Sequence, residues 1–207
     1  MRGAEVLPMF PLGTVLFPSM VLPLRIFEPR YLDMTRACLS GDRRFGVVLI
    51  TRGSEVGGGD ARSNIGCSAS IVQVQDDDTQ MFLATVGTGR IRVIEWLADD
   101  PYPRAKVERW CDPAAPPGFD ETVAELDVAF RNVLALAGEL GEWSVPLSIE
   151  LDEDPALALY QMCAASPIGP FDRHRLLSTE GVETRAELLD EVLADAAVML
   201  RARLGHG

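Results

Sequence analysis

The sequence predicts an α+β protein in which a mainly antiparallel β-barrel or closed sheet precedes a small α-helical bundle. Residues 1–110 hold short apolar or alternating segments with a single helical interruption and no βαβ rhythm. Residues 111–118, CDPAAPPG, carry three prolines and a glycine, which stop a sheet. Beyond them, every long segment repeats its apolar residues at helical spacing. We therefore expect a barrel over 1–110, a proline-rich linker over 111–118 and an acidic bundle over 119–207.

The charge distribution divides the chain at the same place. The 207 residues carry a formal net charge of −12. Residues 1–110 contain 13 basic and 13 acidic side chains, whereas residues 111–207 contain 6 basic and 18 acidic ones. An acidic second half repels phosphate, which argues against nonspecific binding of nucleic acid across the whole chain.

The stretch Leu7–Tyr31, LPMFPLGTVLFPSMVLPLRIFEPRY, organises the first half. Its four internal prolines before Glu28 exclude one continuous helix, so the sequence predicts two short extended pieces and a turn. Pro29 suits the first turn of a helix that Glu28 opens and that runs to about Cys38, with Gly41 just beyond its end. A secretory signal would need an unbroken apolar helix, and no run of about 18 apolar residues can span a membrane. We expect a cytoplasmic protein without membrane contact.

Five further strands are predicted in the first half, all of them short. A glycine-rich loop over 52–64 follows the first of them. The acidic turn at 76–78 joins two strands as a hairpin, and Gly87-Thr88-Gly89 separates two others. The predicted strands cover 45–51, 65–74, 80–86, 90–97 and 104–110.

Four helical segments are predicted in the second half. Asp154-Pro155 is a cap followed by a first-turn proline, and Asp172 opens the next segment. In the last segment the apolar stripe includes Met199. The segments cover 120–140, 155–166, 172–178 and 184–204.

We find no pattern of residues typical of a catalytic, metal or cofactor site. Lys106 is the only lysine and follows no phosphate-binding glycine motif, and His174 lies in the polar segment DRHRLL. The aspartates at 76–78 lack the spacing of a calcium loop. Four widely spaced cysteines are expected to be buried or half-buried thiols in a reducing compartment: Cys38, Cys67, Cys111 and Cys163.

The opening stretch and a set of basic strand residues remain as candidate binding surfaces. Prolines on short extended pieces leave backbone groups free at a sheet edge, which can accept an extended peptide by strand addition. Basic residues alternate with apolar ones on the last predicted strands, which is typical of a solvated face and also leaves open an RNA or nucleotide binder. These basic residues are Arg90, Arg92, Arg104, Lys106 and Arg109.

Several motifs in the first half resemble the Lon substrate-binding (Lon N-terminal) domain family. The opening stretch, FGVVLI at 45–50, SEVGG at 54–58 and VGTGRIRV at 86–93 agree with the family in order and spacing, as does a strand with Gly66, Ala69 and Ile71. The Asp-Pro and Asp-Arg-x-x-Leu-Leu segments of the second half are similar to the helical bundle of that family.

This resemblance implies a PUA-like β-barrel followed by a helical bundle, in a stand-alone member that lacks the AAA+ ATPase and the peptidase. It also implies a non-catalytic module that binds unfolded or extended polypeptide segments, with a role in protein quality control as an adaptor of a protease or chaperone, or as a chaperone itself. The sequence leaves the formation of a homodimer open. The expected peptide-binding residues are Phe10, Leu12, Phe17, Pro18, Leu24, Phe27, Glu28, Arg30, Tyr31 and Arg90.

Overall fold

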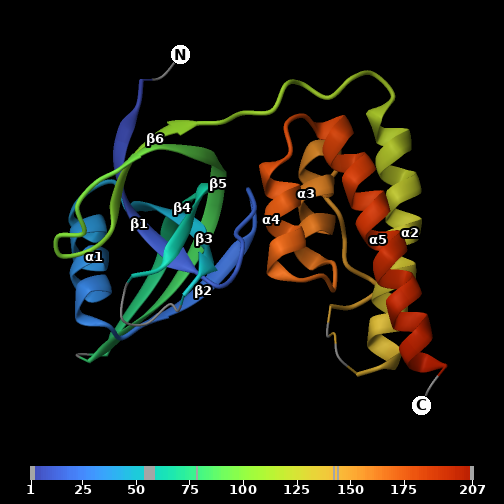
Figure 1. Cartoon of the computed structure of the whole chain (residues 1–207), viewed down its shortest axis with the longest axis horizontal. Helices are drawn as coiled ribbons and strands as arrows, with labels where there is room; N and C mark the ends of the chain where they lie inside the picture. Colours follow the sequence, from blue (N-terminus) through green and yellow to red (C-terminus); the bar gives the residue numbers. More distant parts are fainter. Residues whose placement is uncertain (1–2, 54–58, 78, 142, 144, 206–207) are drawn as a thin grey trace. The chain divides into compact units, whose positions relative to one another are not determined.

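The computed structural model describes residues 3–53, 59–77, 79–141, 143 and 145–205 (Figure 1). The chain forms two compact units, Met1–Cys111 and Asp112–Gly207. The first unit contains strands and one helix, and the second contains helices, so the predicted α+β architecture is confirmed. Among these residues, none of the helices combines the length and the hydropathy that a membrane-spanning segment requires.

The first unit is a closed barrel. Its strands follow the order β2-β5-β4-β3-β1-β6, and an additional pairing of β5 with β6 closes the ring. All pairings are antiparallel except that of β1 with β3, where Met9 lies opposite Gly46. The strands are β1 (Glu5–Leu12), β2 (Val21–Ile26), β3 (Arg44–Arg52), β4 (Ala61–Asp77), β5 (Gln80–Trp96) and β6 (Arg104–Arg109).

Strand β5 corrects one sequence prediction, because Gly87-Thr88-Gly89 does not interrupt it. The strand runs for 17 residues, and its first part pairs with β2 while its second part pairs with β6. A Cβ atom at Gly87 would lie 2.2 Å from the backbone oxygen of Phe17. The glycine therefore permits the loop after β1 to lie directly on the strand, which is one of the roles of glycine inside a sheet.

The loop predicted over 52–64 is also shorter than expected. Strand β4 already begins at Ala61, which pairs with Arg52. At its other end, Asp77 pairs with Gln80, so the predicted hairpin between β4 and β5 is present. Asp78 and the SEVGG motif at 54–58 lie outside the described residues.

Helix α1 (Pro29–Ser40) begins where the sequence predicts, with Pro29 in its first turn. Its buried face is formed by Tyr31, Met34, Thr35 and Cys38. The apolar members of this face pack in one core cluster with Phe10 and Phe45 of the strands. The helix thus covers the apolar residues at the end of β1 and beside β2.

The described residues of the second unit form four helices, of which α2 and α5 lie side by side (Figure 1). Asp154 caps α3 as predicted, because its Oδ1 accepts hydrogen bonds from the backbone N–H groups of Ala156, at 2.8 Å, and Leu157, at 3.4 Å. The helices are α2 (Phe119–Glu139), α3 (Pro155–Ala165), α4 (Pro170–Ser178) and α5 (Val182–Leu204).

A buried ion pair fastens the beginning of α5. Both nitrogens at the end of the Arg185 guanidinium donate to the carboxylate of Asp112, at 2.8 and 3.0 Å, and the Arg185 side chain is fully buried. The same guanidinium donates to the backbone oxygens of Leu176 and Thr179. Asp112 also accepts from the hydroxyl of Tyr160. Asp112, a residue of the predicted linker, therefore contacts both α3 and α5.

Candidate functional site

A pocket of about 200 Å³ lies in the first unit between the end of β1, strand β2 and the first turn of α1. We refer to it as the β1–β2–α1 pocket. Most of its wall is apolar, and its polar members come from the rim of β2 and from the start of α1. The lining residues are Phe10, Leu12, Pro23, Leu24, Arg25, Ile26, Phe27, Glu28 and Tyr31.

The buried wall of this pocket is aromatic. The rings of Phe10 and Tyr31 lie 4.3 Å apart between centroids, tilted by 56°, and the ring of Phe45 meets Phe10 edge-on at 6.2 Å. Such tilted and edge-on pairs are the favoured aromatic geometries. Phe10 thus packs against a ring of α1 on one side and a ring of β3 on the other.

The Tyr31 hydroxyl gives the pocket a measurable pH response. Burial raises the pKa of Tyr31 from its ordinary value of 10.0 to about 12, against the lowering effect of Arg30 and with a further rise from Glu28. The folded state holds this proton more tightly than the unfolded state, so stability present below pH 10 is lost as the pH rises towards 12. We expect Tyr31→Phe to remove a component near pH 12 from the tyrosinate absorbance titration. An unchanged titration in that variant would contradict this assignment.

The mouth of the pocket carries an exposed aromatic side chain beside an ion pair. Phe27 is 55% exposed and lines the pocket, so its ring meets both the solvent and the apolar lining. Arg30 contacts the Glu28 carboxylate at 3.1 Å, and its guanidinium lies 4.5 Å from the centroid of the Tyr31 ring. Glu28 occupies the N-cap position of α1, as predicted, but its side chain pairs with Arg30 and does not cap the helix.

Strand β2, which contributes much of the lining, is an edge strand. Within the described part of the chain it pairs with β5 alone, from Val21 opposite Val86 to Ile26 opposite Met81. Pro23 has no backbone N–H, which is tolerated on edge strands. One side of β2 therefore offers main-chain groups directly beside an apolar pocket.

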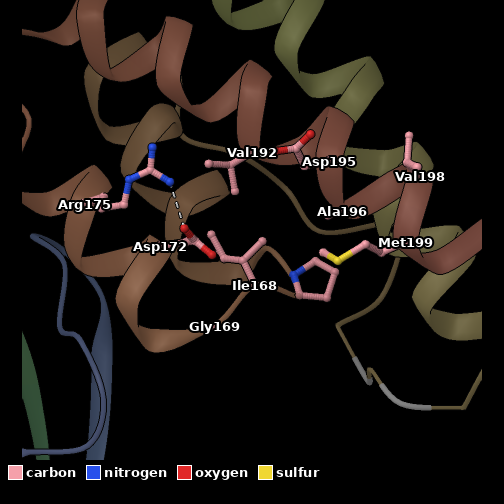
Figure 2. Close-up of a pocket in the computed structure, with 10 residues that line it drawn as sticks. Ile168, Gly169, Asp172, Arg175, Val192, Asp195, Ala196, Val198 and Met199 are labelled. Atoms are coloured by element: carbon pink, nitrogen blue, oxygen red, sulfur yellow. Dashed lines mark hydrogen bonds and ion pairs between the residues drawn. The ribbon is translucent and has the colours of Figure 1, made fainter. Parts of the chain in front are cut away.

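A larger pocket of about 360 Å³ lies in the second unit, between the segment before α4, α4 itself and α5 (Figure 2). Apolar side chains from α5 line it, and Asp172 and Arg175 form an ion pair at 3.0 Å on its wall. Met199 is 62% exposed here, so its predicted place in the buried stripe of the last helix is wrong. The sequence contains no signal for this pocket, because its apolar residues have ordinary helical spacing.

The three buried cysteines are poor nucleophiles, because their thiols stay protonated at neutral pH. Burial raises the pKa of Cys38 to about 11 and the pKa values of Cys67 and Cys163 to about 12. Thiols with such pKa values carry little thiolate at neutral pH. Cys111 is exposed, unlike the prediction for all four cysteines. Among the described residues, no group of three or more His, Cys, Asp or Glu side chains is placed to hold a metal ion.

The family model of the ATP-dependent protease La (LON) substrate-binding domain matches residues 6–195. The chain belongs to this family. The match includes the whole β1–β2–α1 pocket and most of the second unit, so it supports the resemblance carried by the opening stretch.

Three known proteins show how this LON substrate-binding domain compares with others. The Lon protease of Koribacter versatilis is 29% identical over 202 residues, which are 92% of this chain and 24% of that protein. A Lon N-terminal domain protein from Xanthomonas campestris has a TM-score of 0.62 at 25% identity, covering 92% of this chain and 98% of that one. The N-terminal domain of the Mycobacterium avium complex Lon protease shares the fold, with a TM-score of 0.66 at 18% identity over 92% and 99% of the two chains.

The structure brings most of the expected peptide-binding residues together. Arg30 joins the pocket through Glu28 and Tyr31. Phe17 and Pro18 are buried in the loop after β1, and Arg90 lines a different pocket. Sequence reasoning missed three lining residues, Pro23, Arg25 and Ile26, although all three lie within the opening stretch. The expected residues that line the pocket are Phe10, Leu12, Leu24, Phe27, Glu28 and Tyr31.

The basic residues of the last strands do not form one solvent-facing row. Arg90 is buried, with its guanidinium 3.9 Å from the centroid of the Trp110 ring. Arg92 lies over the same ring and contacts Glu108 at 3.6 Å. Lys106 is exposed. The five basic residues are therefore not gathered on one exposed strand face.

Proposed function

We propose that this LON substrate-binding domain recognises extended or unfolded polypeptide segments through the β1–β2–α1 pocket and performs no reaction itself. The observation that carries the proposal is an apolar pocket with an exposed aromatic residue, Phe27, at its mouth and an edge strand beside it. Membership of the family supports a role in substrate recognition. Six of the ten residues expected to contact the peptide line this pocket, and Arg30 contacts two of the lining residues, Glu28 and Tyr31.

The proposed binding mode follows from the two kinds of surface that meet here. An extended peptide aligned with β2 can use main-chain hydrogen bonds for affinity, because an edge strand has backbone groups to offer. Successive side chains of such a peptide point to opposite faces, so alternate ones reach the pocket. Phe10, Leu12 and Tyr31 favour an apolar side chain there, and this preference matches segments that are buried in folded proteins and exposed in unfolded ones.

We propose a place for the chain in protein quality control, where the bound segment passes to a protease or a chaperone. Its relatives support this placement, because the Koribacter versatilis protein is a Lon protease. A chain that held unfolded segments by itself would act as a chaperone. Both roles need the same polypeptide-binding surface.

Fluorescence anisotropy with a labelled, permanently unfolded protein tests the proposed function. We expect saturable binding with a dissociation constant in the micromolar range, of the order of tens of micromolar. The unmodified parent of that protein, which folds, is the control and is expected not to bind, because its apolar segments are buried. Absence of binding to the unfolded form at about 100 μM, with this chain folded by circular dichroism, would contradict the proposal.

A further inference from the structure

Strand β2 presents two chemically different faces to a segment bound along its edge. Its inner face is apolar, because Ile26 belongs to the core cluster that contains Phe10 and Tyr31, and Leu24 packs against that cluster. Its outer face is exposed to solvent and carries the one charge of the strand, that of Arg25. Arg25 also lines the β1–β2–α1 pocket. A segment beside β2 therefore meets apolar groups on one face and a guanidinium on the other.

The main-chain groups of Arg25 face the free edge of β2. The backbone N–H of Gly87 donates to the backbone oxygen of Met20 at 2.9 Å, which extends the register of β2 with β5 by one pair. Hydrogen-bonded pairs alternate along an antiparallel ladder, so the even-numbered residues of β2 bond to β5 and the odd-numbered ones point their main-chain groups away from it. Pro23 has no N–H to offer there. Arg25 is thus the residue of β2 beside the pocket that offers both a backbone donor and a backbone acceptor.

The guanidinium of Arg25 is oriented by side chains from the two neighbouring strands. Its Nε donates to Oε1 of Gln80 on β5 at 2.8 Å. The amide nitrogen of Gln80 donates in turn to the carboxylate of Asp77 on β4 at 3.3 Å, so the amide presents its oxygen to Arg25. With Nε engaged, the two terminal nitrogens of the guanidinium are left for a ligand, and this pair can bind both oxygens of one carboxylate.

The acidic side chains of this region have other partners. Glu28, the carboxylate in the pocket lining, pairs with Arg30 at 3.1 Å. Asp77 contacts Arg25 through the amide of Gln80. Among the residues that the structure describes, Arg25 forms no ion pair. Its positive charge is therefore available at the edge where the polypeptide is proposed to lie.

We propose that Arg25 selects an acidic side chain in the bound polypeptide, so that preferred segments carry an acidic residue between two apolar ones. The selection rests on the proposed function, because it concerns the segment that the β1–β2–α1 pocket binds. A residue opposite Arg25 shares the outer face with it, whereas the residues before and after point to the inner face of Leu24 and Ile26. The carboxylate then accepts hydrogen bonds from the guanidinium while its two neighbours contact the apolar lining.

Fluorescence anisotropy with short labelled peptides tests this pattern. The peptides are identical except for their centre, which is Leu-Glu-Leu, Leu-Gln-Leu or Glu-Leu-Leu. We expect Leu-Glu-Leu to bind about fivefold more tightly than Leu-Gln-Leu at low salt, with a smaller difference at high salt because the pair is exposed to solvent. Glu-Leu-Leu has the same composition and charge, and it should bind more weakly than Leu-Glu-Leu because it cannot place both leucines on the inner face.

Three variants assign the preference to Arg25. Arg25→Gln should bind Leu-Glu-Leu and Leu-Gln-Leu equally, and its affinity for Leu-Gln-Leu should stay within about twofold of that of the wild type. Lys106→Gln is the matched control, because it removes the same charge from an exposed position on β6 outside the pocket, and it should keep the preference. Gln80→Leu keeps the charge of Arg25 but removes the acceptor that orients it, so the preference should fall to about twofold.

The outcomes separate this proposal from the proposed function. Equal affinities of the wild type for Leu-Glu-Leu and Leu-Gln-Leu would overturn the selection by Arg25 and leave polypeptide binding in place. A preference that survives in Arg25→Gln, or equal binding of Leu-Glu-Leu and Glu-Leu-Leu, would overturn it as well. Absence of binding of every peptide at about 100 μM, with the chain folded by circular dichroism, would instead contradict the proposed function itself.

Discussion

Replacing Asp112 with alanine is expected to lower the free energy of unfolding of the second unit by about 3–5 kcal/mol, the usual cost of leaving one partner of a buried ion pair alone. The fully buried guanidinium of Arg185 would lose both of its carboxylate contacts. The backbone N–H of Gly181 and the hydroxyl of Tyr160 would also lose an acceptor. Since total stabilities are commonly about 5–15 kcal/mol, this change is expected to populate unfolded helices under mild denaturant.

Urea unfolding followed by circular dichroism in the helical range measures this effect. Asp172→Ala is the matched control, because Asp172 also pairs with an arginine, Arg175, but both side chains are about half exposed. An exposed pair contributes at most about 1 kcal/mol, so the control should unfold close to the wild type. Equal stability losses in the two variants would show that burial of the Asp112–Arg185 pair does not matter.

The Asp112–Arg185 pair also shows why part of the fold could not be predicted from the sequence. Apolar periodicity predicts the helices of the second unit, and the pair Asp154-Pro155 predicts the start of α3. Both signals are local in the sequence. The pairing of residues 73 positions apart is not local. Asp112 lies in a segment whose prolines indicate a linker, and Arg185 has the spacing of a helix face that accepts either burial or exposure. Only the packed helices decide between the two.

In the barrel, the role of Gly87 also could not be predicted from the local sequence. Its strands are predicted from alternation and turn residues, yet Gly87 is indistinguishable in sequence from a strand break. The structure resolves this ambiguity, because the backbone oxygen of Phe17 occupies the space of the missing side chain. That approach depends on where the loop after β1 folds back, which no local pattern encodes.

More of the β1–β2–α1 pocket than of the rest of the barrel could be predicted from the sequence. Its lining comes largely from one continuous stretch, so the proline and apolar pattern of the opening segment points to it directly. The sequence predicts Arg90 in the same surface, but Arg90 lines a separate pocket with Arg44 and Arg109, because β5 is long enough to pair with β2 at one end and with β6 at the other. Residues that are close in the sequence could be assigned to one surface, whereas residues that meet only across the folded barrel could not.

Replacing Phe27 with alanine is expected to weaken binding of an unfolded polypeptide about 30-fold, which corresponds to about 2 kcal/mol. The phenylalanine is 55% exposed at the mouth of the β1–β2–α1 pocket, so a bound peptide would bury an aromatic surface that the fold leaves in water. Removing it deprives the complex of that burial while leaving the aromatic wall of Phe10 and Tyr31 in place.

Phe171→Ala is the matched control for this prediction. Phe171 is 60% exposed on α4, so the two substitutions remove the same side chain from similarly accessible positions in different units. Both variants should keep the stability of the wild type within about 0.5 kcal/mol, because substitutions at exposed positions rarely change it more. Anisotropy titrations then compare the affinities of two variants that differ only in where the phenylalanine is removed. Equal losses of affinity in the two variants would indicate nonspecific apolar contact and contradict the prediction. A smaller loss for Phe27→Ala than for Phe171→Ala would move the recognition surface away from the barrel.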